Sequence, residues 1–424
     1  MKKGSFKGVI LLAASVFLWH VPIGACASLS LDDAVNMALE QNTSIKITEK
    51  GEDTAKANLD AAKGKNGFSV SAGTSFSESD VNEKGRTDLN SNSISASLPI
   101  YTGGKNQANI DSYDDALHIA KLTTLRKNEN IKLSVIKAYY DILEAQKTIA
   151  VDQESVDNYQ AHLTNVEQLY SAGSKAKVEV LRSSVALSNA RQTLIKAQNA
   201  YDINVSTLKN LIRMNPDEPL TLTNDFYYAA FEQDMQSCLD YAMQNRKDLQ
   251  ADLLDIDKSE KLVKAAKAGY LPTVSLSLSA SWDKQLVPTH DNHAYTAGVS
   301  ADWNIFDSSV TKATVNAAET AVDVAHLTLE NDQETVNLDV RTAYLNMKEA
   351  EKRFVSTQDA IKQAEEDYYI ANEKYRAGEG LMLDIIDAQL ALSTARLNYI
   401  SAQYDYARYK ATVENTMGID AVKQ

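Results

Sequence analysis

Residues 273–282 read TVSLSLSASW, a strict alternation of small polar and apolar side chains that decides the class of fold. A period of two places the apolar side chains on one face of a β-strand and the serines on the other. The run is about ten residues long, the length that a tilted strand needs to cross a bilayer. A strand of a soluble β-sandwich has the same alternation, but the uniformly small polar face favours a membrane strand whose serines face a wet lumen.

Three further runs alternate in the same way, over residues 68–77, 93–101 and 295–306, so the chain contains two strand pairs. Aromatic residues gather at the ends of the runs, as in the interfacial girdles of a membrane barrel. They are Phe68, Tyr101, Trp282, Tyr295, Trp303 and Phe306. The polar segments Glu78 to Asn90 and Asp283 to Asn292 lie between the members of each pair and are expected to be exposed loops.

An internal repeat relates the two halves of the chain. Residues 38–45 align with residues 242–249 at a shift of 204, and residues 61–63 align with residues 265–267 at the same shift. Later segments align at a shift of 205, which brings Gly173 onto Gly378. A near-constant offset over most of each half indicates a duplicated unit rather than a general similarity between Ala-rich helices.

Long helices are expected to make up the rest of each half. The segment from Lys105 to Tyr170 contains neither proline nor glycine. At 1.5 Å per residue, about 65 helical residues form a rod of roughly 100 Å. Apolar residues spaced by three and four follow its lower part and predict a coiled-coil seam. They are Val156, Tyr159, Leu163, Val166 and Tyr170, repeated at Ile361, Ala364, Tyr368, Ala371 and Tyr375.

Two shorter helices, Leu31 to Ala62 and Val178 to Ile212, have about half the length of the rod and are expected to match it when stacked end to end. Each half therefore consists of a half-length helix, a strand pair, a full-length rod, a tip turn and a returning half-length helix. The fold class is mainly α, a two-repeat protomer of long coiled-coil helices and four β-strands, with a membrane β-barrel portion.

The pattern divides the chain into five parts. Residues 1–27 form a secretory signal peptide, with a basic head, an apolar stretch and small residues at its end. The first structural repeat covers residues 28–212 and the second covers residues 235–418. A linker at mid-height of the rods, residues 213–234, contains two prolines, and residues 419–424 are a C-terminal tail.

The cysteines bear on processing and stability. Cleavage before Ser28 removes Cys26, whereas the surrounding Ile-Gly-Ala-Cys also resembles a lipoprotein box in which Cys26 is lipidated; the first alternative is slightly favoured. Either way Cys238 has no disulfide partner in the mature chain, so cross-links do not hold this exported protein together.

Charge and motifs exclude several functions. The chain has 43 basic and 57 acidic residues, a net charge of −14, which argues against nucleic acid as a partner. His290 and His293 have no third ligand nearby in the sequence and do not predict a metal. No phosphate loop or Ser/His/Asp spacing is present, so neither an enzyme nor a cofactor is predicted. Outside the signal peptide no apolar run reaches the roughly 18 residues of a membrane helix.

Four strands cannot close a barrel, and open edges in lipid are costly, so the chain is expected to assemble. Three copies give a 12-stranded barrel whose lumen continues through a hollow helical cylinder, which is a conduit. One alternative is a barrel-anchored structural or adhesive coiled-coil protein, but a stalk needs a barrel segment at one end only, and here strand pairs lie inside both halves. A free-standing porin needs more strands in one chain.

The doubled pattern, together with residues 98–104 (LPIYTGG) and 375–378 (YRAG), resembles the TolC-type outer-membrane efflux family over essentially the whole mature chain. The resemblance implies a homotrimer in outer-membrane lipid, with a 12-stranded barrel and an α-helical periplasmic tunnel. It also implies docking on a periplasmic adaptor (membrane fusion) protein and an inner-membrane transporter. Such ducts serve drug efflux, metal efflux and type I secretion of proteins, and the duct sequence does not separate these cargoes.

The turns at the far ends of the rods are the candidate adaptor-docking tips, because they match each other in the two halves. Glycine there tolerates the left-handed conformation that closes a helical hairpin. The residues selected are Ala172, Gly173, Val178, Ala377, Gly378 and Leu381.

Acidic residues follow both tips at the same spacing. Glu179 and Asp384 lie six residues beyond the tip glycines, and Asp387 shares a helix face with Asp384. An ordinary solvated acidic face is the alternative, but the family resemblance places the two aspartates at an inward-facing periplasmic constriction. The family has a basic residue two positions after the second tip glycine that helps to hold the closed state. Gly380 occupies that position here, which leaves Tyr375 and Glu179 as the candidate contact.

Overall fold

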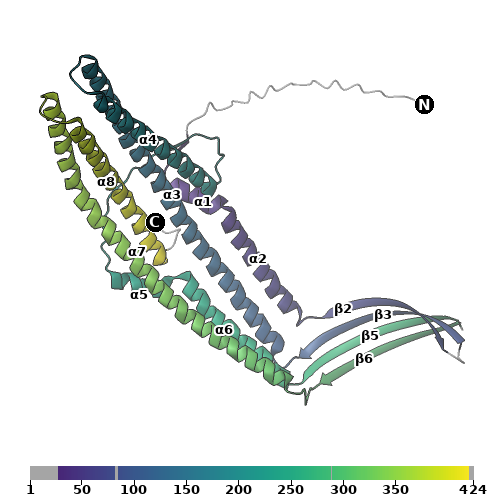
Figure 1. The fold of residues 1–424 in the computed structure, drawn as a ribbon. Coiled ribbons are helices and arrows are strands. Elements are labelled where there is room, and N and C mark those ends of the chain that lie inside the picture. Colours follow the sequence, from purple (N-terminus) through teal and green to yellow (C-terminus); the bar gives the residue numbers. More distant parts are fainter. Residues whose placement is uncertain (1–26, 82–84, 288, 420–424) are drawn as a thin grey trace, which may run out of the picture.

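The computed structural model describes residues 27–81, 85–287 and 289–419. Cys26 and the predicted signal peptide up to it lie outside the described residues, as do residues 420–424 of the tail. The described chain is elongated, with a β-sheet at one end and the turns of two helical hairpins at the other (Figure 1). Among the helices of the described residues, none combines the length and the apolar composition of a membrane-spanning segment.

The two halves have the same order of elements. The first contains α1 (Leu31–Gln41), α2 (Thr43–Gly64), β2 (Ser69–Val81), β3 (Gly85–Tyr101), α3 (Lys105–Ser171) and α4 (Lys177–Ile212). The second contains α5 (Met235–Asn245), α6 (Lys247–Lys267), the 3₁₀ turn η1 (Ala268–Tyr270), β5 (Thr273–Val287), β6 (Thr289–Asp302), α7 (Val310–Arg376) and α8 (Met382–Thr416). Two short strands, β1 (Ala27–Leu29) and β4 (Leu220–Leu222), pair in parallel beside the linker.

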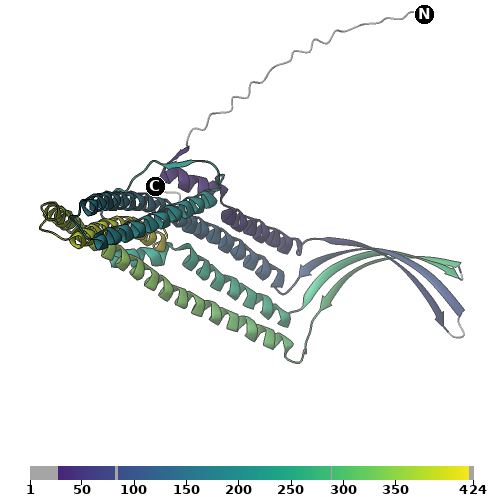
Figure 2. The same cartoon turned by 45° about the horizontal axis from the view of Figure 1, so that its top comes forward.

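The four long strands form one antiparallel sheet in the order β2-β3-β5-β6. The predicted alternation is confirmed, because serines face each other across the strands on one side of the sheet. The hydroxyl oxygens of Ser71 and Ser95 are 2.8 Å apart, and those of Ser275 and Ser300 are 3.0 Å apart. The sheet curves as it leaves the helices (Figure 2).

The predicted loops within the strand pairs were wrong over most of their length. Glu78 lies opposite Asp88, and Asp283 lies opposite Asn292, so both strand pairs continue as a ladder through these polar segments. Backbone hydrogen bonds hold an antiparallel ladder whatever its side chains, so polar residues extend a strand beyond its apolar part. The last predicted strand was too long: β6 ends at Asp302, and Trp303 instead donates its indole N–H to the Tyr270 carbonyl at 3.0 Å.

The long rods are confirmed, since α3 and α7 each have 67 residues, about 100 Å at 1.5 Å per residue. In the first half α4 packs along the tip end of α3, and α1 and α2 pack along the remainder (Figure 1). In the second half α8 takes the tip end of α7, with α5 and α6 beyond it. The coiled-coil seam is buried at Tyr159, Val166, Ala371 and Tyr375.

The opening helix is interrupted, contrary to the single helix predicted from Leu31 to Ala62. Asn42 adopts an extended backbone between α1 and α2, and its side chain accepts the Ser44 N–H at 2.9 Å and donates to the Leu211 carbonyl at 2.9 Å. Arg246 breaks the second half at the equivalent position, buried and paired with Asp248. Asn42 also bonds to the end of α4, and Arg246 also pairs with Asp339 of α7, so each break is stabilised by a contact to a neighbouring helix.

The linker packs across both halves at mid-height of the rods. Tyr404 and Tyr406 of α8 donate their hydroxyls to the Asp225 carboxylate at 3.1 Å and to the Ala229 carbonyl at 2.7 Å. The ring of Phe226 lies 5.9 Å from that of Phe354 on α7, centroid to centroid. Tyr139 of α3 donates its hydroxyl to the Leu29 carbonyl at 3.1 Å. The cores of the two halves therefore contact each other at the level of the linker, and the tip hairpins extend beyond the linker.

Candidate functional site at the helical tips

The two tip turns have the same backbone geometry. Gly173 follows α3 with φ of 76°, and Gly378 follows α7 with φ of 83°. The Gly173 N–H donates to the Tyr170 carbonyl and the Ser174 N–H to the Leu169 carbonyl, each at 2.9 Å. The second turn repeats these bonds, so both rods end in a Schellman motif, which favours glycine at its left-handed position. This agrees with the role predicted for the two glycines.

Gly380 lies where the second tip folds back on α7. A Cβ atom there would be 2.9 Å from the Tyr375 backbone nitrogen, and the Gly380 N–H donates to the Lys374 carbonyl at 3.0 Å. The backbone contact leaves no room for a side chain, so this turn accepts only glycine without a shift. The position that would carry a basic residue is therefore closed by the conformation of the turn itself.

A basic residue of the first tip, which was not among the predicted site residues, lies against the second hairpin. Lys175 Nζ is 4.6 Å from the centroid of the Tyr375 ring and 3.7 Å from Glu179 Oε2. The internal repeat could have identified this lysine, because a shift of 205 pairs Lys175 with Gly380. The basic residue that contacts Tyr375 therefore belongs to the first tip and does not lie at position 380 of the second.

Tyr375 and Glu179 meet through this lysine rather than through a direct hydrogen bond. The Tyr375 side chain is 5% exposed, and neither its hydroxyl nor Glu179 Oε2 has a hydrogen-bond partner in the described part of the chain. Burial, and then the nearby Glu179 carboxylate, raise the pKa of Tyr375. A neutral phenol therefore lies between the hairpins, with Lys175 held by its ring and by the carboxylate.

Asp384 and Asp387 are in a different setting, exposed on the first turns of α8. Asp384 Oδ2 accepts the Leu381 N–H at 3.1 Å, so this carboxylate also caps the helix and complements its dipole. Asp387 lies one turn further on, and its charge contributes to the raised pKa of Tyr159, behind burial and Tyr368. The four predicted constriction residues thus form two groups within a protomer.

The predicted docking residues are exposed at the end of the molecule farthest from the sheet (Figure 1). Val178 and Leu381, the apolar members, are 50% and 66% exposed at the starts of α4 and α8. Behind them the two hairpins are joined by hydrogen bonds between α3 and α8. Ser155 and Ser393 hydroxyls are 2.8 Å apart, and Asn158 donates to Gln389 at 3.0 Å.

The two repeats match a known protein family. A family model described as "Outer membrane efflux protein" matches residues 34–212 and 238–418. The chain belongs to this family. The toxin and drug export protein A of Aggregatibacter actinomycetemcomitans is 26% identical over 326 residues, 73% of this chain and 69% of that protein. The cobalt-zinc-cadmium resistance protein CzcC of Cupriavidus metallidurans is 21% identical over 399 residues, 94% of this chain and 92% of the relative.

Solved structures have the same fold as this outer membrane efflux protein. The CmeC outer membrane channel of Campylobacter jejuni superposes with a TM-score of 0.82 at 17% identity, covering 93% of this chain and 87% of that one. The outer membrane protein VceC of Vibrio cholerae gives a TM-score of 0.78 at 18% identity, covering 92% of this chain and 96% of that one. The predicted family and mainly α fold class are confirmed, as is the outer-membrane localisation.

Proposed function

We propose that this protein is the outer-membrane exit duct of a tripartite efflux pump or type I secretion system, and that it works as a homotrimer. The edges of the sheet are the observation that most directly supports the trimer. Its outer strands β2 and β6 each have a long free edge in the protomer, and a free edge in lipid leaves backbone groups unsatisfied. Three protomers joined edge to edge remove every edge and produce a 12-stranded barrel.

The two faces of the sheet support this assembly. Small hydroxyls occupy one face, as a water-filled lumen requires, while Val70, Leu278 and Tyr295 are exposed on the other, as outer-membrane lipid requires. The helices continue from the sheet for the length of α3 and α7, so a trimer would extend the lumen into a periplasmic tunnel. Strand pairs inside both halves favour a duct over a barrel-anchored adhesive stalk.

The tips are the part that such a tunnel presents to a periplasmic adaptor protein, and the adaptor would connect it to an inner-membrane transporter. The matching Schellman turns and exposed Val178 and Leu381 support docking there. Relatives are named for toxin and drug export and for cobalt, zinc and cadmium resistance, so cargo is expected to follow the transporter rather than the duct.

The constriction would be formed by Asp384 and Asp387 of three chains. Both carboxylates are exposed in the protomer, which leaves them available to a lumen. Carboxylates gathered in a narrow space attract multivalent cations.

The experiment that tests the duct is a mass measurement in mild detergent followed by single-channel recording in a planar bilayer. A trimer that conducts ions supports the proposal. A monodisperse monomer would contradict the trimer, and a stable trimer without conductance would favour the adhesive alternative.

A further inference from the structure

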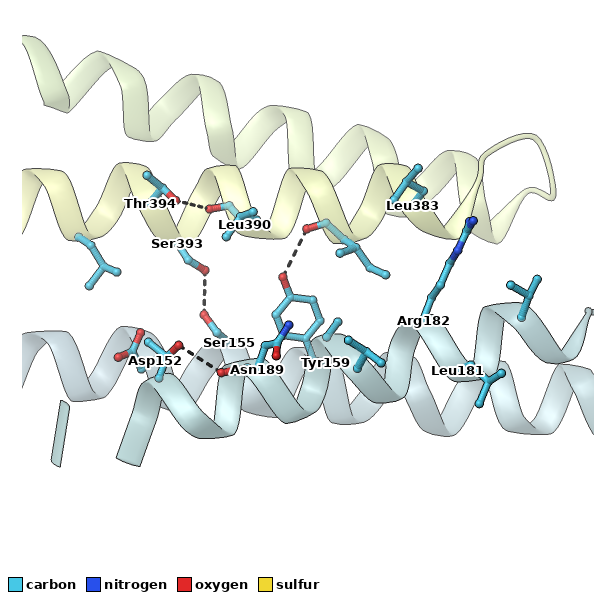
Figure 3. A pocket seen from close by; sticks show the side chains of 17 residues that line it. Asp152, Ser155, Tyr159, Leu181, Arg182, Asn189, Leu383, Leu390, Ser393 and Thr394 are labelled. Atoms are coloured by element: carbon cyan, nitrogen blue, oxygen red, sulfur yellow. Dashed lines mark hydrogen bonds between the residues drawn. The ribbon is translucent and has the colours of Figure 1, made fainter. Parts of the chain in front are cut away.

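A cavity of about 680 Å³ lies between the two hairpins, a short way behind the tips (Figure 3). Helix α3 forms its floor, α4 one wall and α8 the other. The walls are mainly aliphatic: Leu181 and Val185 come from α4, and Leu383 and Leu390 come from α8. The volume falls within the range of cavities that bind small organic molecules, which are mostly apolar with a few polar groups.

One carboxylate at the floor of the cavity has no partner. Asp152 is 5% exposed, and its Oδ2 atom makes no hydrogen bond in the described structure. The neighbouring Ser155 hydroxyl is already bonded to Ser393 at 2.8 Å. Arg182, the basic residue of the lining, lies at the opposite end of the cavity from Asp152 (Figure 3). A buried carboxylate without a partner is costly, and a bound cation that donates a hydrogen bond to it removes that cost.

We propose that this cavity binds an amphipathic organic cation, with its ammonium group on Asp152 and its apolar body between α4 and α8. The apolar walls select for the body, and the single buried carboxylate selects for the positive charge. A neutral apolar molecule fits the walls but leaves Asp152 without a partner. An anionic amphiphile places a second negative charge beside it. The inference concerns a ligand site in the protomer and does not depend on the proposed aspartate constriction.

Imipramine, a tricyclic tertiary amine, and iminodibenzyl, its neutral tricyclic core, are suitable probes. The full-length protein in amphipol is titrated with each by isothermal titration calorimetry. Imipramine is expected to bind saturably, with one site per protomer, and at least tenfold more tightly than iminodibenzyl. The Asp152→Asn variant keeps the shape of the side chain and removes its charge, so imipramine should bind at least tenfold more weakly while iminodibenzyl is unaffected.

Two further variants make the result specific. Asp157→Asn removes an exposed carboxylate from the same helix and should leave imipramine binding unchanged. Leu390→Trp enlarges a wall residue that is 60% exposed, and it should weaken both probes by filling the cavity without disturbing the core. Equal imipramine affinity in the wild type and Asp152→Asn, or no saturable binding to the wild type, would overturn the proposal. If Asp152→Asn fails to fold, loss of binding of both probes in Leu390→Trp locates the site. The preference for a cation is then tested by competition against bound imipramine. Dodecyl sulfate that competes as well as dodecylammonium would refute that preference.

Discussion

Lys175 Nζ of the first tip lies 4.6 Å from the ring centroid of Tyr375, so a cation of one hairpin covers an aromatic ring of the other. Glu179 holds the same ammonium group at 3.7 Å. Lys175 is only partly exposed, with a side-chain exposure of 24%, so water screens these contacts incompletely. The tips of the two hairpins are therefore linked by a contact between a cation and an aromatic ring.

Removing this cation should loosen the tips. A cation–π contact of this kind contributes about 0.5–2 kcal/mol, so Lys175→Met is expected to raise the conductance or open probability of single channels in a planar bilayer. Lys177→Met is the matched control, because Lys177 is an exposed lysine two residues away at the start of α4. The same increase in both variants would show that net charge at the tip matters and the ring contact does not.

A side chain at position 380 should destabilise the folded protein. Gly380→Ala places a Cβ atom 2.9 Å from the Tyr375 nitrogen, and overpacking against backbone costs about 1–3 kcal/mol. The thermal unfolding midpoint of the purified protein should fall. Gly51→Ala is the control: it lies within α2 with open space around it, and its higher helix propensity should leave stability unchanged or slightly raised. An unchanged midpoint in Gly380→Ala would mean that the turn relaxes without cost.

The aspartate ring predicts block by a trivalent cation. Hexaamminecobalt(III) added on the periplasmic side should reduce the conductance of the wild-type channel, and the Asp384→Asn/Asp387→Asn double variant should escape the block. Asparagine is preferred to alanine because its carbonyl oxygen can still accept the Leu381 N–H that Asp384 now accepts. Equal block in both proteins, with trimers intact, would identify the two residues as a solvated acidic face.

Adaptor docking at the tips is testable by crosslinking in cells. A photoreactive residue at Ala172 or Ala377 should capture the periplasmic adaptor, whereas the same residue at Asp291, on the strand pair at the opposite end, should not. Capture from Asp291 alone would place the adaptor at the wrong end for the proposed orientation.

A carboxylate between α6 and α7 predicts a pH dependence of stability. Burial, followed by the charges of Asp332, Asp248 and Asp255, raises the pKa of Asp252 to about 6. Because this pKa is raised relative to the unfolded chain, its favourable contribution is complete below about pH 4 and is lost as the pH rises through 6. Asp252→Asn should therefore raise the thermal midpoint at pH 7.5 more than at pH 4.5. A gain that is the same at both pH values would mean that Asp252 has an ordinary pKa.

Features that repeat along the chain or follow a short period could be predicted from the amino-acid sequence. Alternation along residues 273–282 predicted a strand with one polar and one apolar face, and the stretch without proline or glycine predicted the rods. The 205-residue shift predicted the matching tips at Gly173 and Gly378. Each depends on residues close together in the chain, or on a copy of them, so a linear pattern is enough.

Features that join distant segments of the chain could be found only in the folded protein. Asn42 breaks a helix because Leu211 accepts its amide, and the polar strand ends extend because a partner strand continues beside them. Lys175 reaches Tyr375, and Asp152 is buried beneath α4 and α8, because two hairpins pack together. The burial of these side chains and the charges around them depend on residues that are far apart in the sequence. Local periodicity does not predict which distant segments pack together.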